Sequence, residues 1–331
     1  MVEGGSLLIT ALILVLAAEF INGWTDAPNA IATVVSTRVL PPSLAVLMAA
    51  VLNIVGALAT GTAVAYTIGA GIVKLEVISL PVIIAAMLTV IIWSTVGWFY
   101  GIPTSESHEL VAALAGAGLA TGGPSVLLWE GWQKVLIGLG FSTLLGFSLG
   151  AVIMTGLYWI LRRANLSFIR SAFSRLQIVS AAFLAFSHGS NDGQKFMGIF
   201  TATLVLGGIV SDFVVPLWVM LLCGGVMAVG TALGGWRIMR TVGFKITKLE
   251  PVHGFAAASS GTLTILLASR FGIPLSTTHC ITTSIMGVGA TRRFSAVRWG
   301  VARSIVLTWI ITFPACGLIG WGIASLLKIA L

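Results

Sequence analysis

The chain has 331 residues, of which 57% are hydrophobic and 8% are charged, with a formal net charge of +8 and a mean hydropathy of +1.06. A soluble domain carries roughly 25% charged residues, so this composition excludes a water-soluble protein and predicts an integral membrane protein. Short turns between apolar runs hold the basic residues, and membrane orientation explains them there better than nucleic-acid binding. Cys223, Cys280 and Cys316 show no CxxC spacing, which argues against a zinc site or a disulfide framework.

Ten apolar runs follow one another along the chain, and each is predicted to be a membrane helix because about 20 apolar residues cross the hydrocarbon core. The runs lie near residues 6–37, 43–68, 81–100, 105–121, 135–161, 176–207, 214–235, 252–269, 276–290 and 302–327. The segment before the first run has an acid and no base, unlike a signal peptide. We therefore expect that run to be a permanent span.

Basic residues collect in alternate connections between these runs, which indicates the orientation of the chain. By the positive-inside rule the connections that hold them are cytoplasmic, so both termini are predicted to lie on the outer side of the cell membrane. The basic residues of these connections are Arg38, Arg162, Arg163, Arg170, Arg175, Arg237, Arg240, Lys245, Lys248, Arg292, Arg293, Arg298 and Arg303.

Two stretches of the first half of the sequence recur in the second half. "FINGWTDAPNA" from Phe20 aligns with "FSHGSNDGQKF" from Phe186, and "GIPTSESH" from Gly101 aligns with "GIPLSTTH" from Gly272. An odd number of spans per half would invert the second copy. We therefore predict an all-α polytopic membrane protein of two inverted repeats, each of about five spans, with broken helices and re-entrant helix starts, as in secondary transporters. The expected divisions are a first repeat (1–163), a cytoplasmic basic loop (164–175) and a second repeat (176–331).

The first duplicated stretch places acids and amides at membrane depth, where a charged side chain costs at least ~2.5 kcal/mol unless it meets a partner, an ion or water. Pro28 and several glycines can break these helices and free backbone carbonyls. Hard oxygen ligands of this kind suit Na⁺ or a proton as a coupling ion, with no other cofactor. The predicted coupling-cation ligands, which are also the metal ligands if the ion is Na⁺, are Asp26, Asn29, Asn191 and Asp192.

The second duplicated stretch predicts a helix start at membrane depth, because Gly-Ile-Pro ends one segment and the Ser/Thr cluster caps the next. A helix start carries free N–H donors and partial positive charge, which together favour an anion. The two starts would face each other around a tetrahedral oxyanion. The predicted anion-binding residues are Thr104, Ser105, Ser107, Ser276, Thr277, Thr278 and Lys195.

Further polar residues are expected beside these sites rather than in contact with the ions. They are Asn22, Thr25, His108, Glu109, His188 and His279. Taken one by one, His108 and His279 are more often satisfied packing residues, and the alternative for the two acidic clusters is that they only join helices, with Asp192 pairing with Lys195. The duplication of the acidic position, at Asp26 and Asp192, favours a functional interpretation of the whole set.

Four segments together resemble the inorganic phosphate transporter (PiT) family. They are "NGWTDAPNAIATVVSTR" at 22–38, "GIPTSESHELVAALAGAG" at 101–118, "AFSHGSNDGQKFMGI" at 185–199 and "GIPLSTTHCITTSIMGVG" at 272–289. The resemblance implies cation-coupled phosphate uptake, with cations at the Asp-containing segments and the anion at the Ser/Thr segments. Thr25 departs from the family pattern, which commonly has Asn before the first Asp.

Several alternatives stay open at this point. The family also includes sulfate permeases, and an anion channel would use the same helix starts without a coupling cation. An intramembrane hydrolase is disfavoured because the chain lacks HExxH and GxSxG. Expected partners are therefore phosphate or sulfate, Na⁺ or H⁺, and membrane lipid. A homodimer is compatible with the sequence.

Overall fold

The computed structural model describes residues 2–74 and 76–330, and these two ranges are almost entirely helical. One isolated bridge between Val73 and Leu127 is the only β-pairing within them. Apolar runs form helices here because a helix satisfies its backbone N–H and C=O groups inside its own segment, where a bilayer offers no water. The predicted all-α membrane architecture is confirmed.

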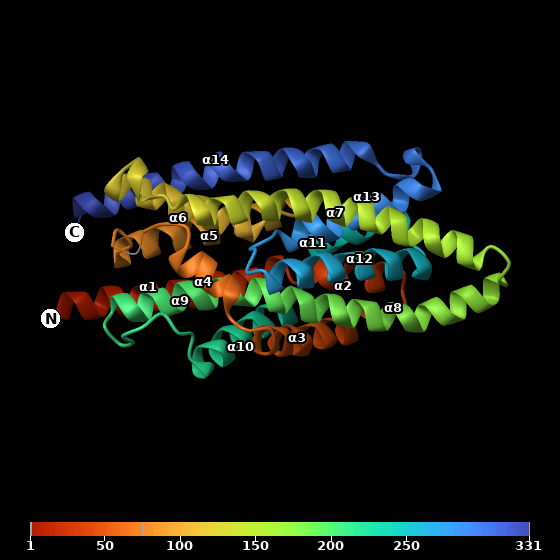
Figure 1. The fold of residues 1–331 in the computed structure, drawn as a ribbon, viewed down its shortest axis with the longest axis horizontal. Coiled ribbons are helices and arrows are strands. Elements are labelled where there is room, and N and C mark those ends of the chain that lie inside the picture. Colours follow the sequence, from red (N-terminus) through yellow and green to blue (C-terminus); the bar gives the residue numbers. More distant parts are fainter. Residues whose placement is uncertain (1, 75, 331) are drawn as a thin grey trace.

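The helices follow the predicted apolar runs, except that the run 43–68 is divided into two helices by a break at residues 60–62 (Figure 1). The first half contains α1 (Val2–Thr25), α2 (Pro28–Ser36), α3 (Pro42–Ala59), α4 (Ala63–Ala70), α5 (Leu80–Tyr100), α6 (Glu106–Gly122), η1 (Pro124–Val126) and α7 (Trp129–Leu161). The second half contains α8 (Leu166–His188), the π-turn η2 (Gly189–Gly193), α9 (Gln194–Leu206), α10 (Leu217–Leu233), α11 (Trp236–Arg240), η3 (Thr241–Lys245), α12 (Pro251–Arg270), α13 (Thr277–Arg292), η4 (Phe294–Ala296) and α14 (Trp299–Ala330).

Six helical segments of the described chain are long and apolar enough to cross a membrane, and the pair 217–233 and 236–245, bent by 61°, would be a seventh. Three of the ten predicted spans do not reach this standard. The helices α6 and α13 have only 17 and 16 residues, and the run through α8 and α9 carries polar residues at its middle. All three exceptions carry duplicated polar sequence, and the fourth segment that does so, at residues 20–30, lies in the span 5–36, which reaches the standard.

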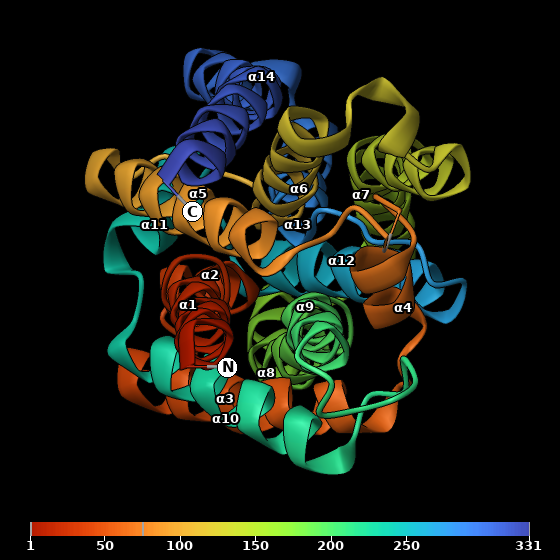
Figure 2. The same ribbon diagram turned by 90° about the vertical axis from the view of Figure 1, so that its left-hand side faces the viewer.

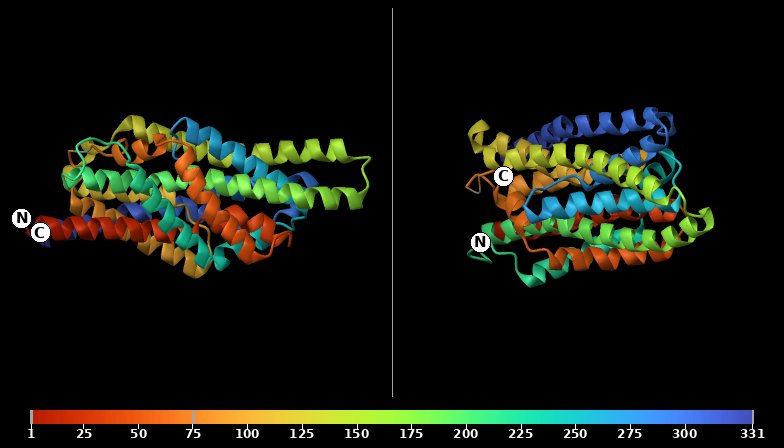
Figure 3. Two further views of the ribbon diagram at one scale, coloured as in Figure 1. Left: turned by 90° about the horizontal axis from the view of Figure 1, so that it is seen from below. Right: turned by 45° about the vertical axis from the view of Figure 1, so that its right-hand side comes forward.

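The central helices run in opposite directions. In Figure 1 the pair α1–α2 leads away from the end marked N, whereas α8–α9 leads back towards it, and Figure 2 shows the two pairs side by side. Figure 2 also looks almost along α6 and α13, which overlap in that view although Figure 1 places them towards opposite ends of the molecule. The two chain ends lie at the same end of the bundle (Figure 3).

Close backbone approaches recur at equivalent positions of the two halves. A Cβ on Gly23 would collide with the carbonyl oxygen of Met227 in α10, and a Cβ on Gly189 would collide with that of Asn53 in α3. Glycine is the residue that permits such an approach. Each broken helix therefore packs closely against one helix from the other half of the chain: α1–α2 against α10, and α8–α9 against α3.

The segment 164–175, predicted as a basic loop, is mostly helical. Asn165 caps α8 by accepting a hydrogen bond from the backbone N–H of Ser167, so the connection after α7 is only residues 162–165. Leu166 begins an exposed first turn, which includes Ser167 and extends the helix beyond the apolar run. The sequence boundary was misplaced because a basic helix end looks like a loop when only hydropathy is considered. The outer limits of the two predicted repeats, residues 1 and 331, lie outside the described residues.

Candidate functional site

The helix break between α1 and α2 presents a carboxylate and an amide at the buried centre. Pro28 occupies the first turn of α2 and has no N–H to continue the hydrogen-bond ladder, so the chain turns at residues 26–27. Nδ2 of Asn29 donates a hydrogen bond to Oδ1 of Asp26 at a distance of 2.5 Å. The side-chain oxygen of Asn29 is buried with no partner among the described residues, which leaves it free to ligate a cation.

The second break is the π-turn η2, which contains Asn191 and Asp192, and such turns inside α-helices are frequent at functional sites. Asn191 donates to the hydroxyl of Ser269 at 3.0 Å and to the carbonyl of Ile273 at 3.3 Å. Its own side-chain oxygen is also buried without a partner in the described chain. Both predicted amide ligands therefore keep a free hard oxygen.

The two Gly-Ile-Pro segments form matching turns that lead into α6 and α13. Gly101 and Gly272 adopt left-handed φ values of 65° and 63°, a conformation that glycine reaches without steric cost. Ser105 and Ser276 then take the N-cap positions, and only Ser276 uses its side chain, accepting from the N–H of His279. The hydroxyl of Ser105 has no partner in the described ranges.

The starts of α6 and α13 meet at the centre of the molecule. Ser107 donates to the carbonyl of Leu275 at 2.7 Å, and the rings of His108 and His279 lie 4.5 Å apart, edge to face. Two backbone N–H groups at each start have no acceptor within residues 2–74 and 76–330, and they belong to Glu106, Ser107, Thr277 and Thr278. Two helix N-termini with free donors are thus brought together, as the sequence predicted.

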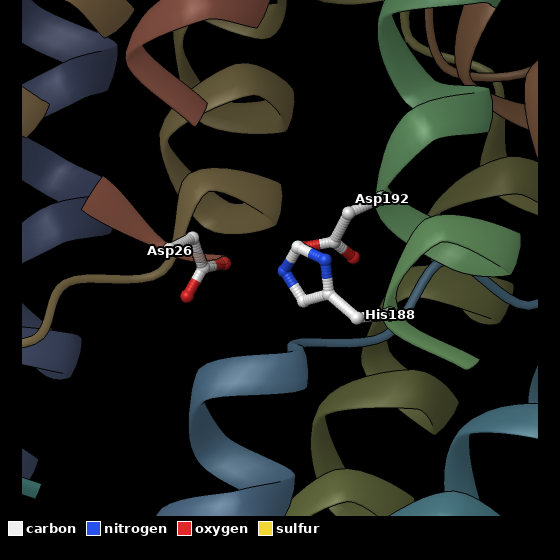
Figure 4. A group of neighbouring side chains, drawn as sticks. All are labelled: Asp26, His188 and Asp192. Atoms are coloured by element: carbon white, nitrogen blue, oxygen red, sulfur yellow. The ribbon is translucent and has the colours of Figure 1, made fainter. Parts of the chain in front are cut away.

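Figure 4 shows how the two breaks face each other: Asp26 lies opposite Asp192 and His188. Ligand atoms of these three residues all lie within 4.8 Å of one another, close enough to hold one metal ion. His188 contacts Asp192 at 3.3 Å through Nε2 and Asn53 at 3.3 Å through Nδ1. The arrangement joins a carboxylate from each half of the chain.

Hydroxyl groups of α13 close the space between the two carboxylates. Thr277 donates to Oδ2 of Asp192 at 2.8 Å and lies 3.2 Å from Oδ2 of Asp26, and Thr278 also donates to Asp26. The cavity beside Asn29 and His188 measures about 10 Å³, which holds at most one water molecule. The centre is therefore closed, and the hydroxyl groups of Thr277 and Thr278 donate to the carboxylates of Asp192 and Asp26.

Lys195 is 1% exposed, and its ammonium group is bound entirely by oxygen. It pairs with Asp192, donates to Ser107 at 2.5 Å and donates to the carbonyl of Leu275 at 3.1 Å. The sequence predicted Lys195 as an anion ligand, whereas here its contacts are a carboxylate, a hydroxyl and a carbonyl.

The remaining predicted residues surround this centre. Thr25 donates to Glu106 at 2.7 Å and so joins the end of α1 to the start of α6, while Asn22 donates to Glu19 at 2.9 Å. Ser94 of α5 donates to Glu109. These contacts tie polar groups to one another at membrane depth, which satisfies part of their hydrogen-bonding capacity.

The two histidines of the helix starts have mainly packing contacts. His279 stacks on Trp309 with ring centroids 3.5 Å apart, and His108 lies 4.6 Å from Phe313. Thr104 is buried against Gly97 of α5. Sequence reasoning missed Asn53, Ser94 and Ser269, although each is a polar residue inside or at the end of an apolar run, which was the available signal.

Residues 22–320 match the phosphate transporter family. The chain belongs to this family. Among its relatives in the phosphate transporter family, it is 46% identical over 314 residues to a probable low-affinity inorganic phosphate transporter of Rhizobium meliloti, covering 95% of this chain and 94% of the relative. It is 43% identical over 320 residues to a protein of the same description from Bacillus subtilis, with coverages of 95% and 96%.

A solved structure described as "The sodium-dependent phosphate transporter" has the same fold as this chain. It superimposes with a TM-score of 0.90 at 24% sequence identity, over 98% of this chain and 100% of the other. The family resemblance drawn from four short segments therefore extends over residues 22–320, and the shared fold over 98% of the chain. The break residues and helix starts occupy the interior of that shared fold.

Proposed function

We propose that the protein imports inorganic phosphate together with a cation by alternating access in the cell membrane. The observation that carries this proposal is the meeting of two helix N-termini, each with free N–H donors, beside two carboxylates at the buried centre. Donors suit the oxyanion and carboxylates suit its coupling cation. We further propose that the matched contacts of the two halves reflect inverted repeats, which would rock against each other.

Coupling to a cation follows from energetics. Moving one negative charge into a cell at −100 mV costs about 2.3 kcal/mol, and phosphate near neutral pH carries one or two. A channel would not concentrate it. Na⁺ is supported by the description of the structural neighbour as sodium-dependent, and H⁺ by the buried carboxyl groups, which could carry a proton.

Phosphate is favoured over sulfate by the chemistry of the centre as well as by the relatives' names. A protonated phosphate still has P–OH donors, which can bond to the oxygens of Asp26, Asp192 or the Leu275 carbonyl. Sulfate near neutral pH has no proton to donate, so the same oxygens repel it. Buried acceptors that are left facing an anion without a donor cost binding free energy.

Uptake into proteoliposomes tests the proposal. Labelled phosphate should accumulate above its equilibrium level when an inward Na⁺ or proton gradient is imposed, and accumulation should collapse when both gradients are removed. Labelled sulfate should accumulate far less under the same gradients. Equal phosphate entry with and without gradients would indicate a channel and overturn coupled transport.

A further inference from the structure

The sequence alignment of the two breaks sets Lys195 against Asn29, because each residue stands three positions after the duplicated Asp. Their contacts are equivalent too. Asn29 donates to Asp26 and, at 3.0 Å, to the hydroxyl of Thr278 in α13, whereas Lys195 donates to Asp192 and to the hydroxyl of Ser107 in α6. The same position is therefore neutral in the first half and cationic in the second.

The ammonium group of Lys195 sits where a small cation would be bound. Its three oxygen partners come from three segments: a carboxylate from η2, a hydroxyl from α6 and a main-chain carbonyl from the turn before α13. Carboxylate, hydroxyl and carbonyl oxygens are the ligands that hard cations take in proteins. A lysine supplies the positive charge at this position but cannot leave with the substrate.

The two carboxylates differ accordingly in charge compensation. Asp192 has Lys195 as an ion-pair partner and His188 beside it, and in the described chain no Lys, Arg or His lies within ion-pair distance of Asp26. A buried carboxylate without a counter-charge is costly. Asp26 is thus the carboxylate left for a mobile ion.

We propose that Lys195 is a tethered cation that permanently fills one of two equivalent cation positions, so that a mobile coupling ion binds only on the Asp26 side. This inference rests on the proposed function and specifies its coupling. It predicts that neutralising Lys195 opens the second position to Na⁺. The first half of the chain suggests the variant, Lys195→Asn, which reproduces the residue found at position 29.

Thermal unfolding of the purified protein in detergent gives a readout that does not depend on transport. Lys195→Asn leaves Asp192 without its ion-pair partner, so the variant should unfold at a lower temperature than the wild type when choline is the only cation. Replacing choline by Na⁺ at constant ionic strength should recover much of that loss, because a ligand that binds only the folded state stabilises it. Lys195→Arg, which keeps the charge, should respond to Na⁺ no more than the wild type.

The double variant Lys195→Asn/Asp192→Asn is the matched control, since it lacks both the tethered charge and the carboxylate that would hold Na⁺. Its response to Na⁺ should be no larger than that of the wild type. If Lys195→Asn cannot be purified even in Na⁺, Lys195→Gln offers the same amide on a longer side chain. A Na⁺ response equal to the wild type in the single variant would overturn the proposal.

Proteoliposomes then separate this proposal from the proposed function. Phosphate uptake by the wild type tests transport itself, whereas the charge moved per phosphate tests Lys195. In Na⁺, Lys195→Asn should carry about one more positive charge per phosphate than the wild type, since its cation now moves with the substrate. Weaker phosphate binding with no gain in Na⁺ dependence would instead make Lys195 an anion ligand and overturn the inference.

Discussion

Asp26 and Asp192 are equivalent in the duplicated sequence but have different neighbours. Asp26 accepts hydrogen bonds from Asn29 and Thr278 and lies 3.2 Å from the hydroxyl of Thr277, and all three of these groups are neutral. Asp192 faces the ammonium group of Lys195. An Asp→Asn change would therefore remove a proposed cation ligand in the first case and removes an ion-pair partner in the second.

We predict that Asp26→Asn yields a folded protein that no longer accumulates phosphate under a cation gradient. Asp192→Asn should also prevent this accumulation. It should lower the free energy of unfolding by about 3–5 kcal/mol as well, because it leaves the buried ammonium group of Lys195 without its carboxylate partner. Gradient-driven uptake and thermal unfolding, measured on both variants, check the two effects. Full accumulation by Asp26→Asn would remove this residue from coupling.

The two N-cap serines should also respond differently to removal of the hydroxyl group. Ser276 caps α13, so Ser276→Ala should destabilise the protein by about 1 kcal/mol. The hydroxyl of Ser105 is buried without a partner in the described residues, so Ser105→Ala should leave stability unchanged and weaken phosphate binding by about 0.5–1.5 kcal/mol. Thermal unfolding and the phosphate concentration for half-maximal uptake distinguish them. Equal effects on stability would contradict the assignment of Ser105 to the substrate.

At the scale of helices, the π-turn η2 depends on a close approach to α3. A Cβ on Gly189 would meet the backbone carbonyl of Asn53, which cannot rotate away. Gly189→Ala should therefore lower the free energy of unfolding by about 1–3 kcal/mol. A Cβ on Gly140 of α7 would meet no heavy atom of another described segment within 4 Å, and Gly140→Ala should be neutral or stabilising by up to ~1 kcal/mol.

Thermal unfolding of these two glycine variants, compared under one detergent condition, is the measurement. Similar shifts in both would show that the approach of η2 to α3 is not a constraint. The comparison is matched because the chemical change is the same and both glycines lie inside helical segments.

Most helix positions, and the breaks at the duplicated segments, were predictable from the sequence because they follow from local signals, whereas the break at residues 60–62 was not. The apolar runs predicted the helices. Pro28 predicted the break between α1 and α2, and the Gly-Ile-Pro segments predicted the starts of α6 and α13. The duplication also predicted that Asp26 and Asp192 would come together, which the structure shows. These features need only residue type and spacing.

Partners across the bundle were not predictable in the same way. Ser269 meets Asn191, and Asn53 meets His188, across 78 and 135 residues of sequence. A single polar residue in an apolar run indicates that it needs a partner but not which helix supplies it. The pairing of Lys195 with Asp192 is by contrast a local contact, since the two residues stand three positions apart, and the sequence offers it as the alternative to an anion-binding role for Lys195.

At the scale of the whole molecule, the described interior is strongly acidic. The described interior contains one buried ammonium group, that of Lys195, and five buried carboxyl groups, which belong to Glu19, Asp26, Glu106, Glu109 and Asp192. Large apolar side chains such as Leu144, Trp159 and Leu318 point outward instead. A centre with this excess of carboxyl groups would be costly if all were ionised, so protons or bound cations must accompany them, in agreement with cation coupling.

The orientation of the bundle in the membrane is the last prediction. By the positive-inside rule we predict that residues 162–165 and the first turn of α8 lie inside the cell. The loop after α9 lies at the opposite end of the molecule, with both termini (Figure 1). Ser167 and Ser211 are exposed residues at these two ends. In intact cells, a membrane-impermeant maleimide should label Ser211→Cys and should reach Ser167→Cys only after permeabilisation. The native cysteines are buried and provide a low background. Labelling in the reverse order would place the termini inside and would show that the positive-inside rule fails for this chain.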